Sequence, residues 1–160
     1  MNIKRYIATI ILAIVLLLNF SCTDWLDVKP VDRMSEDQLY STEAGFRQAL
    51  NGIYVELNHA DLYGDELLVN TVEILAQRYK FSSMGTLTNQ YHLAEFDYTT
   101  DYAKKCGSRI WEKAYALIAN VNKLLKNADS HKDLFTGDSY DLITGEAYAL
   151  RAFLHFDLLR

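Results

Sequence analysis

Cys22 is the residue whose position most clearly implies chemistry. It directly follows Ser21, and before these two residues lies an apolar run at residues 7–18 that Lys4 and Arg5 precede. A basic start, a short apolar run and a small residue before a cut are typical of a secretory signal peptide. The run is shorter than the about 20 apolar residues that a membrane-spanning helix needs. We therefore expect residues 1–21 to be a signal peptide and Cys22 to be the first residue that remains.

A cysteine at the cut resembles the signal of bacterial lipoproteins, in which the cysteine sulfur is acylated. Two positions depart from the strict pattern, because Asn19 stands where Leu is usual and Phe20 is bulkier than the usual residue. Each acyl chain contributes about 0.8 kcal/mol per buried methylene, and two or more chains anchor a protein stably. The sequence thus predicts lipidation at Cys22 and a membrane anchor. The alternative is an ordinary signal peptide cut nearby, which would leave Cys22 free.

Other patterns that could carry catalysis or bind a metal are weak. Asp61, Asp65 and Glu66 are close together, but acidic residues at the start of a helix are explained by the helix dipole. Cys106 has no expected disulfide partner, and a buried, inert thiol is a better prediction for it than a free, reactive one. Cys106 and His131 could form a Cys–His pair, but nothing in the sequence places them together. The four histidines lack metal-ligand spacing: His59, His92, His131 and His155. We predict no enzymatic activity, no metal site and no cofactor.

The composition favours one helical body. Without Lys4 and Arg5, 14 of the 16 basic residues remain against 21 acidic residues, and no basic cluster points to nucleic acid as a partner. One Pro and seven Gly in 160 residues are few for an all-β fold with many tight turns. The chain left after residue 21 is long enough for one modest core.

Apolar residues at helical spacing predict helices at residues 42–58, 66–80, 101–127 and 140–160. Thr42 is the expected N-cap of the first helix. Gly45 and Gly52 weaken that helix and suggest close packing against another helix. Residues 22–41 are expected to be an extended leader, and residues 42–160 a helical domain. Trp111 lies on the apolar stripe of the third helix and is expected in the core.

Residues 81–100 carry no helical stripe, and loops of that length are often functional. This segment and the residues just after it interleave polar residues with Tyr91, Phe96, Tyr98 and Tyr102. Such a mixture suits sugar binding, because a sugar's apolar face stacks on a ring while its hydroxyls accept and donate hydrogen bonds. The alternative is that the rings only pin the loop to the body.

Five segments, in order and spacing, resemble the SusD/RagB family. They are Cys22-Thr-Asp-Trp-Leu-Asp-Val-Lys-Pro30, Ala49-Leu-Asn-Gly-Ile-Tyr54, Leu75-Ala-Gln-Arg-Tyr79, Ile110-Trp-Glu-Lys-Ala-Tyr115 with Ile118-Ala-Asn-Val-Asn122, and Gly145-Glu-Ala-Tyr-Ala-Leu-Arg-Ala-Phe-Leu-His-Phe-Asp-Leu-Leu-Arg160. The resemblance covers nearly the whole chain but only the N-terminal part of the family.

The resemblance implies an all-α fold whose helix pairs look like tetratricopeptide repeats. It also implies a lipoprotein of the outer membrane of Bacteroidota that faces the cell exterior. Such a protein binds glycans or other nutrients over a SusC-like TonB-dependent transporter and has no enzymatic activity. Only Cys22 carries over as a functional residue, for lipidation, and the ligand-binding residues stay unknown.

A different class of function stays open, in which the helices form an interaction module that docks a membrane partner without binding a ligand. The last predicted helix is still strongly apolar at residue 159, so we expect the chain to be the truncated front part of a longer protein. A repeat-like body without its following elements exposes an apolar face. We expect that face around Phe153, Phe156 and Leu159, with poor solubility of the 160-residue form.

Overall fold

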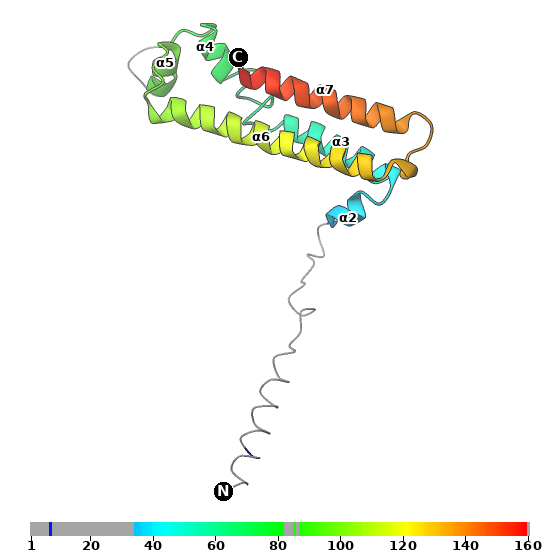
Figure 1. Ribbon diagram of the computed structural model, residues 1–160. Coiled ribbons are helices and arrows are strands. Elements are labelled where there is room, and N and C mark those ends of the chain that lie inside the picture. The colour runs from blue at the N-terminus through cyan, green and yellow to red at the C-terminus, as the bar shows by residue number, and fades with distance from the viewer. Residues whose placement is uncertain (1–6, 8–33, 82–84, 86, 160) are drawn as a thin grey trace. The chain divides into compact units, whose positions relative to one another are not determined.

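The computed structural model describes residue 7, residues 34–81, residue 85 and residues 87–159. Cys22, all of the predicted signal peptide except residue 7, and most of the predicted leader lie outside these residues. The chain divides into residues 1–35 and residues 36–160, and the fold described below is that of the second unit. Its described part is all-helical without strands (Figure 1), which confirms the all-α fold class.

Three long helices dominate this unit, and shorter ones flank them. In chain order they are α2 (Glu36–Leu39), α3 (Glu43–Leu57), α4 (Thr71–Leu75), α5 (Thr88–Ala94), α6 (Asp101–Ser130), the 3₁₀ helix η1 (Lys132–Leu134) and α7 (Ser139–Leu159). Helix α2 falls in the predicted extended leader, so that part of the leader is helical. Within the described ranges, none of the helices is both long enough and apolar enough to cross a bilayer.

Helices α6 and α7 form an antiparallel hairpin. Three contacts join them in opposite chain order: Asp129 with Tyr140, Asn122 with Arg151, and Tyr115 with His155. Helix α3 packs against both helices of the hairpin. The result is a three-helix core with helix pairs of the kind that the sequence predicts.

Side-chain caps fix where α3 and α6 begin. The Thr42 hydroxyl accepts a hydrogen bond from the Gly45 amide at 3.2 Å, and the Thr100 hydroxyl accepts one from the Ala103 amide at 3.3 Å. Each satisfies an amide that has no partner inside its helix. The predicted cap at Thr42 is therefore confirmed. The predicted helices at 42–58, 101–127 and 140–160 are also confirmed, although α6 continues to Ser130.

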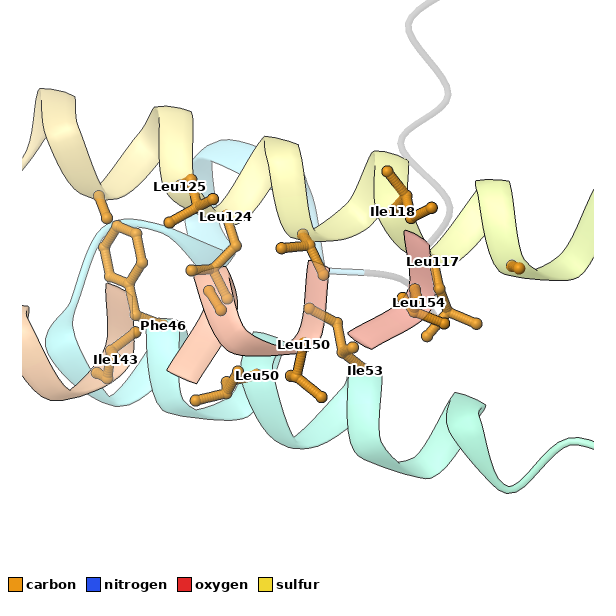
Figure 2. Packing of buried hydrophobic residues seen from close by; sticks show 14 of the residues in the cluster. Phe46, Leu50, Ile53, Leu117, Ile118, Leu124, Leu125, Ile143, Leu150 and Leu154 are labelled. Carbon is orange, nitrogen blue, oxygen red and sulfur yellow. The ribbon is translucent and has the colours of Figure 1, made fainter. Parts of the chain in front are cut away.

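The core lies where α3, α6 and α7 meet (Figure 2). Each helix supplies large aliphatic or aromatic side chains that are almost fully buried, among them Phe46, Leu50 and Ile53 from α3, Leu117, Val121 and Leu124 from α6, and Ile143, Leu150 and Leu154 from α7. A smaller cluster joins α4, α5 and the first turn of α6 through Ile74, Leu93, Ala94 and Ala103. Burial of this apolar surface is the main force that holds the helices together.

Polar contacts tie the start of α3 to the connection between α6 and α7. The Glu43 carboxylate accepts hydrogen bonds from Arg47 at 2.9 Å and from the Thr136 hydroxyl at 2.8 Å. Together with Ser139 these groups lower the pKa of Glu43 to about 2, and the contact with Arg47 is the largest cause. Glu43 therefore stays charged at neutral pH and orders the connection.

Only the middle of the predicted second helix at residues 66–80 is helical, so its predicted length is wrong. The Asp65 carbonyl accepts hydrogen bonds from the amides of Leu68, Val69 and Asn70, which forms a turn instead of a helical ladder. Helix α4 covers only Thr71–Leu75, and Gln77 then takes a φ of 59°, which ends the helical conformation. The explanation of Glu66 by a helix dipole also fails, because no helix begins there.

The prediction that residues 81–100 lack a helix is also wrong, because α5 lies among them. Its Leu93 and Ala94 are buried against Ile74, and Gln77 Nε2 donates to the Ala94 carbonyl at 2.6 Å. These contacts come from residues distant in sequence, so the tertiary contacts stabilise a helix that local spacing does not indicate.

Gly45 and Gly52 differ in what surrounds them, although both lie in α3. A Cβ on Gly45 would overlap the Leu39 carbonyl oxygen, whereas a Cβ on Gly52 would meet nothing within 4 Å. Close packing is therefore confirmed for Gly45, against the end of α2, and is wrong for Gly52.

We predict opposite effects of alanine at these two positions. Gly52→Ala should raise the free energy of unfolding by about 0.5–1 kcal/mol, because alanine costs less backbone entropy in a helix. Gly45→Ala should lower it by about 1–3 kcal/mol, because the new methyl must displace backbone. Urea unfolding followed by circular dichroism measures both. Stabilisation by both variants would show that α2 does not pack on Gly45.

Candidate functional site

A buried carboxylate holds the turns before α4 against α6. Glu66 is only 2% exposed. Its Oε2 accepts hydrogen bonds from Asn70 Nδ2, at 3.1 Å, and from the Thr71 hydroxyl, and its Oε1 accepts one from Arg109 Nη2 on α6. Arg109 Nε also lies 3.7 Å from Asp61. A buried charge is tolerated only when it is paired and hydrogen-bonded, and Glu66 is both.

Cys106 lies one turn before Arg109 and is buried, as the sequence predicts. Its sulfur is 3.8 Å from Arg109 Nη2. Burial, and next the nearby Cys106, raises the pKa of the Tyr102 hydroxyl, so this tyrosine stays neutral beside the cluster. The inert role predicted for Cys106 fits its lack of exposure, since reactive thiols are accessible ones.

An apolar groove lies beside this cluster, between α4, α6 and the end of α7. Its volume is about 360 Å³. It is lined by Leu67, Thr71, Val72, Leu75, Gly107, Ile110, Trp111, Asp157 and Leu158. The Thr71 hydroxyl is bonded to Glu66, and the Asp157 carboxylate accepts from the Tyr63 hydroxyl. The two polar side chains of the lining are thus already engaged by other parts of the protein.

Trp111 stands at the edge of this groove and is not a core residue. It is 53% exposed, so the prediction that places it in the core is wrong. Its ring lies 5.2 Å from that of Tyr115, and the Tyr115 ring lies 6.2 Å from that of His155 on α7. Aromatic side chains from both helices of the hairpin therefore meet at its surface. The spacing along α6 alone does not reveal this, because it also fits a fully buried stripe.

The aromatic residues of the predicted loop do not form one platform. Tyr102 packs against the cluster around Ile74, which fits the expectation that such a ring pins the chain to the body. Phe96 and Tyr98 are exposed on the turn after α5. Sugar binding through these two rings stays a prediction.

Phe153, Phe156 and Leu159 are exposed on the last turns of α7, as the sequence predicts. Phe153 stacks on Tyr63 with ring centroids 5.3 Å apart. Phe156 and Leu159 add apolar surface near the groove residue Leu158. This end of the hairpin therefore gathers exposed apolar side chains.

The described ranges hold no group of three or more His, Cys, Asp or Glu side chains that could bind a metal ion. His59 pairs with Asp61 at 3.4 Å and His92 with Asp97 at 3.5 Å. Cys106 lies in α6 and His131 is the residue that caps its C-terminal end, 25 positions later. At 1.5 Å per residue the two are about 37 Å apart along the helix, so they cannot act together. Cys22 lies outside the described residues.

Comparisons with known proteins agree with the resemblance seen in the sequence. A family model for SusD-like proteins, described as starch-binding and associating with the outer membrane, matches residues 24–160. The SusD-like protein P25 of Formosa agariphila is 27% identical over 144 residues, which are 88% of this chain and 27% of that protein. The chain thus spans about a quarter of the length of this curated relative. No solved structure matches the chain.

Loss of the Arg109 guanidinium should destabilise the protein because it leaves Glu66 buried with fewer donors. Removing one partner of a buried ion pair lowers the free energy of unfolding by about 3–5 kcal/mol. We expect a smaller loss of about 2 kcal/mol for Arg109→Met, because the Arg109 side chain itself reaches solvent. Lys113→Met is the matched control, since Lys113 also leaves α6 to meet a carboxylate, Glu56, that is half exposed. It should cost less than about 1 kcal/mol. Equal losses in urea unfolding would contradict the importance of Glu66.

Proposed function

The chain belongs to the SusD-like family, and from that premise we propose that it is a lipid-anchored nutrient-binding protein of the outer membrane. It binds a glycan at the cell exterior and delivers it to a SusC-like TonB-dependent transporter. It holds the ligand without chemical turnover. Cys22 is its lipid attachment site, and residues 1–21 are removed on export.

The observation that carries this proposal is the extent of the family match. The match begins at residue 24, two residues after Cys22, and continues to residue 160. This start supports the boundary that the sequence predicts between an export signal and the mature protein. The description of the family as starch-binding and outer-membrane-associated supports a glycan as the ligand.

A second candidate function is an interaction module that docks a membrane partner and binds no ligand itself. The apolar groove beside α6 favours it, because the polar side chains that line the groove are bonded elsewhere. Ligand pockets usually offer a few polar groups that orient the ligand. Direct ligand binding distinguishes the two candidates, because the nutrient-binding function requires it and the docking function does not.

We predict that Cys22→Ala releases the exported protein from the membrane, because it removes the sulfur that carries the lipid. The measurement is fractionation of cells followed by immunoblotting. Cys106→Ala is the control, since Cys106 is the other cysteine of the chain and is buried. It should leave the protein in the membrane fraction. Membrane retention of Cys22→Ala would contradict lipid anchoring there.

We also predict saturable binding of a glycan without cleavage. Calorimetric titration of the purified chain with maltooligosaccharides, and then with a wider glycan panel, should show binding to at least one of them. Chromatography of the same samples should show no shorter products. A flat calorimetric response across the whole panel would favour the docking function instead. Shorter products that accumulate with time would contradict a protein that only binds the glycan.

If Phe96 and Tyr98 form part of the sugar site, replacing both with alanine should weaken that binding. Tyr54→Ala on α3 is the control, because Tyr54 is also exposed but lies outside the loop. The Tyr54→Ala variant should bind the glycan with unchanged affinity.

A further inference from the structure

The short helix α2 is packed onto the start of α3 (Figure 1). Tyr40, the residue after α2, is only 5% exposed, and its ring centroid lies 4.9 Å from that of Phe46. The missing side chain of Gly45 leaves room for the Leu39 carbonyl, which a Cβ at this position would overlap. The chain therefore joins the folded body at α2, before the first long helix begins.

An ion pair connects α2 to α6 as well. Glu36 Oε2 lies 2.8 Å from Lys123 Nζ, and Glu36 Oε1 accepts a hydrogen bond from Asn127 Nδ2 at 3.2 Å. The same Asn127 amide donates to the Lys123 carbonyl at 3.0 Å, which keeps it directed along the surface of α6. Both α3 and α6 therefore hold α2, close to the residue at which α6 ends.

This attachment is weaker than the packing of the three-helix core. None of the four residues of α2 is buried, although Leu39 packs partly against the core. The side chains of Lys123 and Glu36 are 52% and 45% exposed, and such surface ion pairs contribute little to stability. Tyr40 is thus the main attachment. A segment with so little buried surface opens at a lower free energy than the whole fold.

The position of α2 also determines how much chain lies between the body and Cys22. Glu36 is 14 residues after Cys22, and a chain of that length spans at most about 50 Å. If α2 and Tyr40 detach, the folded body begins at Glu43, which is 21 residues after Cys22. The limit then rises to about 75 Å. Release of α2 would lengthen the connection by half without unfolding α3.

We propose that residues 36–42, which contain α2 and Tyr40, form a releasable clamp on the connection to the membrane anchor, and we call them the tether clamp. In the structure the clamp is closed, so a pull on Cys22 acts first on the contacts of Tyr40 and Glu36. Under a sufficient pull these contacts break before the core does, and the anchored body gains reach while α3, α6 and α7 stay packed. The role in anchoring rests on the proposed lipid at Cys22.

Single-molecule force spectroscopy tests this order of events. The gene product is made from Cys22 to the first stop codon, with alanine in place of Cys106 and of any further cysteine. Handles attach to Cys22 and to a new thiol from Ser130→Cys, at the exposed end of α6. The seven residues of the clamp release at most about 25 Å when they are extended. We expect a reversible first step no longer than this, at lower force than the unfolding of the core.

Two results of this measurement would overturn the proposal. One is loss of α2 and the core in a single step, because the clamp would then not release separately. The other is a first step much longer than about 25 Å, because more than seven residues would have detached.

Two tyrosine variants test the attachment itself. Tyr40→Ala should remove the first step, because α2 is then detached before any force is applied. Tyr54→Ala is the matched control, since Tyr54 is an exposed tyrosine on α3, and it should keep the step at the same force. Circular dichroism checks that both variants keep their helices. An unchanged step in a folded Tyr40→Ala variant would show that Tyr40 does not hold the clamp.

Hydrogen exchange of the unmodified protein gives a measurement without variants. The Tyr40 amide donates to the Glu36 carbonyl at 3.0 Å, so its exchange reports the closed clamp. It should exchange more slowly than an unprotected amide but at least about tenfold faster than the amide of the buried Leu124 on α6. Exchange as slow as that of Leu124 would show that α2 opens only with the core. Exchange without any protection would show that the clamp is not closed.

The clamp and the lipid anchor fail separately. The protein in the force and exchange measurements can lack the lipid, so their outcome depends on the clamp alone. Membrane retention of Cys22→Ala would contradict the anchor at that residue and leave these measurements unaffected.

Discussion

The burial of the Glu66 carboxylate is the constraint on which the position of the turns before α4 against α6 depends. A carboxylate that is only 2% exposed needs hydrogen-bond donors around it, and three side chains supply them. Asn70 and Thr71 are local to its turn, whereas Arg109 comes from the first third of α6. The ion pair with Arg109 therefore fixes the turns before α4 on one side of α6. Residues of α4 and Trp111 of α6 line the groove between these two helices.

The long helices could be predicted from the sequence because their signals are local. Thr42 and Thr100 mark two starts, and apolar residues at steps of three and four continue for many turns behind them. The short helices could not be predicted in the same way. Helix α5 is stabilised by burial of Leu93 against α4, which lies about twenty residues away in sequence. The turn at Glu66 depends on Arg109, and nothing in the spacing of residues 66–80 indicates a partner 43 positions further on.

The surface of α6 shows why the candidate site was only partly predictable. Its apolar stripe is wide, since Tyr115 points about 120° away from the buried Val121 at 100° per residue. A stripe of that width indicates contact on more than one side, but it does not tell which edge is covered. On the core side of the stripe, residues such as Leu124 are fully buried. Trp111 was assigned wrongly because periodicity alone cannot separate a core ring from one at the border of a face.

The engaged polar groups decide what the groove can bind. A sugar is held by rings together with polar side chains that are ready to accept and donate hydrogen bonds. In this groove the Thr71 hydroxyl donates to Glu66 and the Asp157 carboxylate accepts from the Tyr63 hydroxyl, so both polar side chains of the lining already bind other parts of the fold. An apolar side chain entering beside Trp111 breaks neither bond and removes apolar surface from water. The groove therefore favours a protein segment over a glycan.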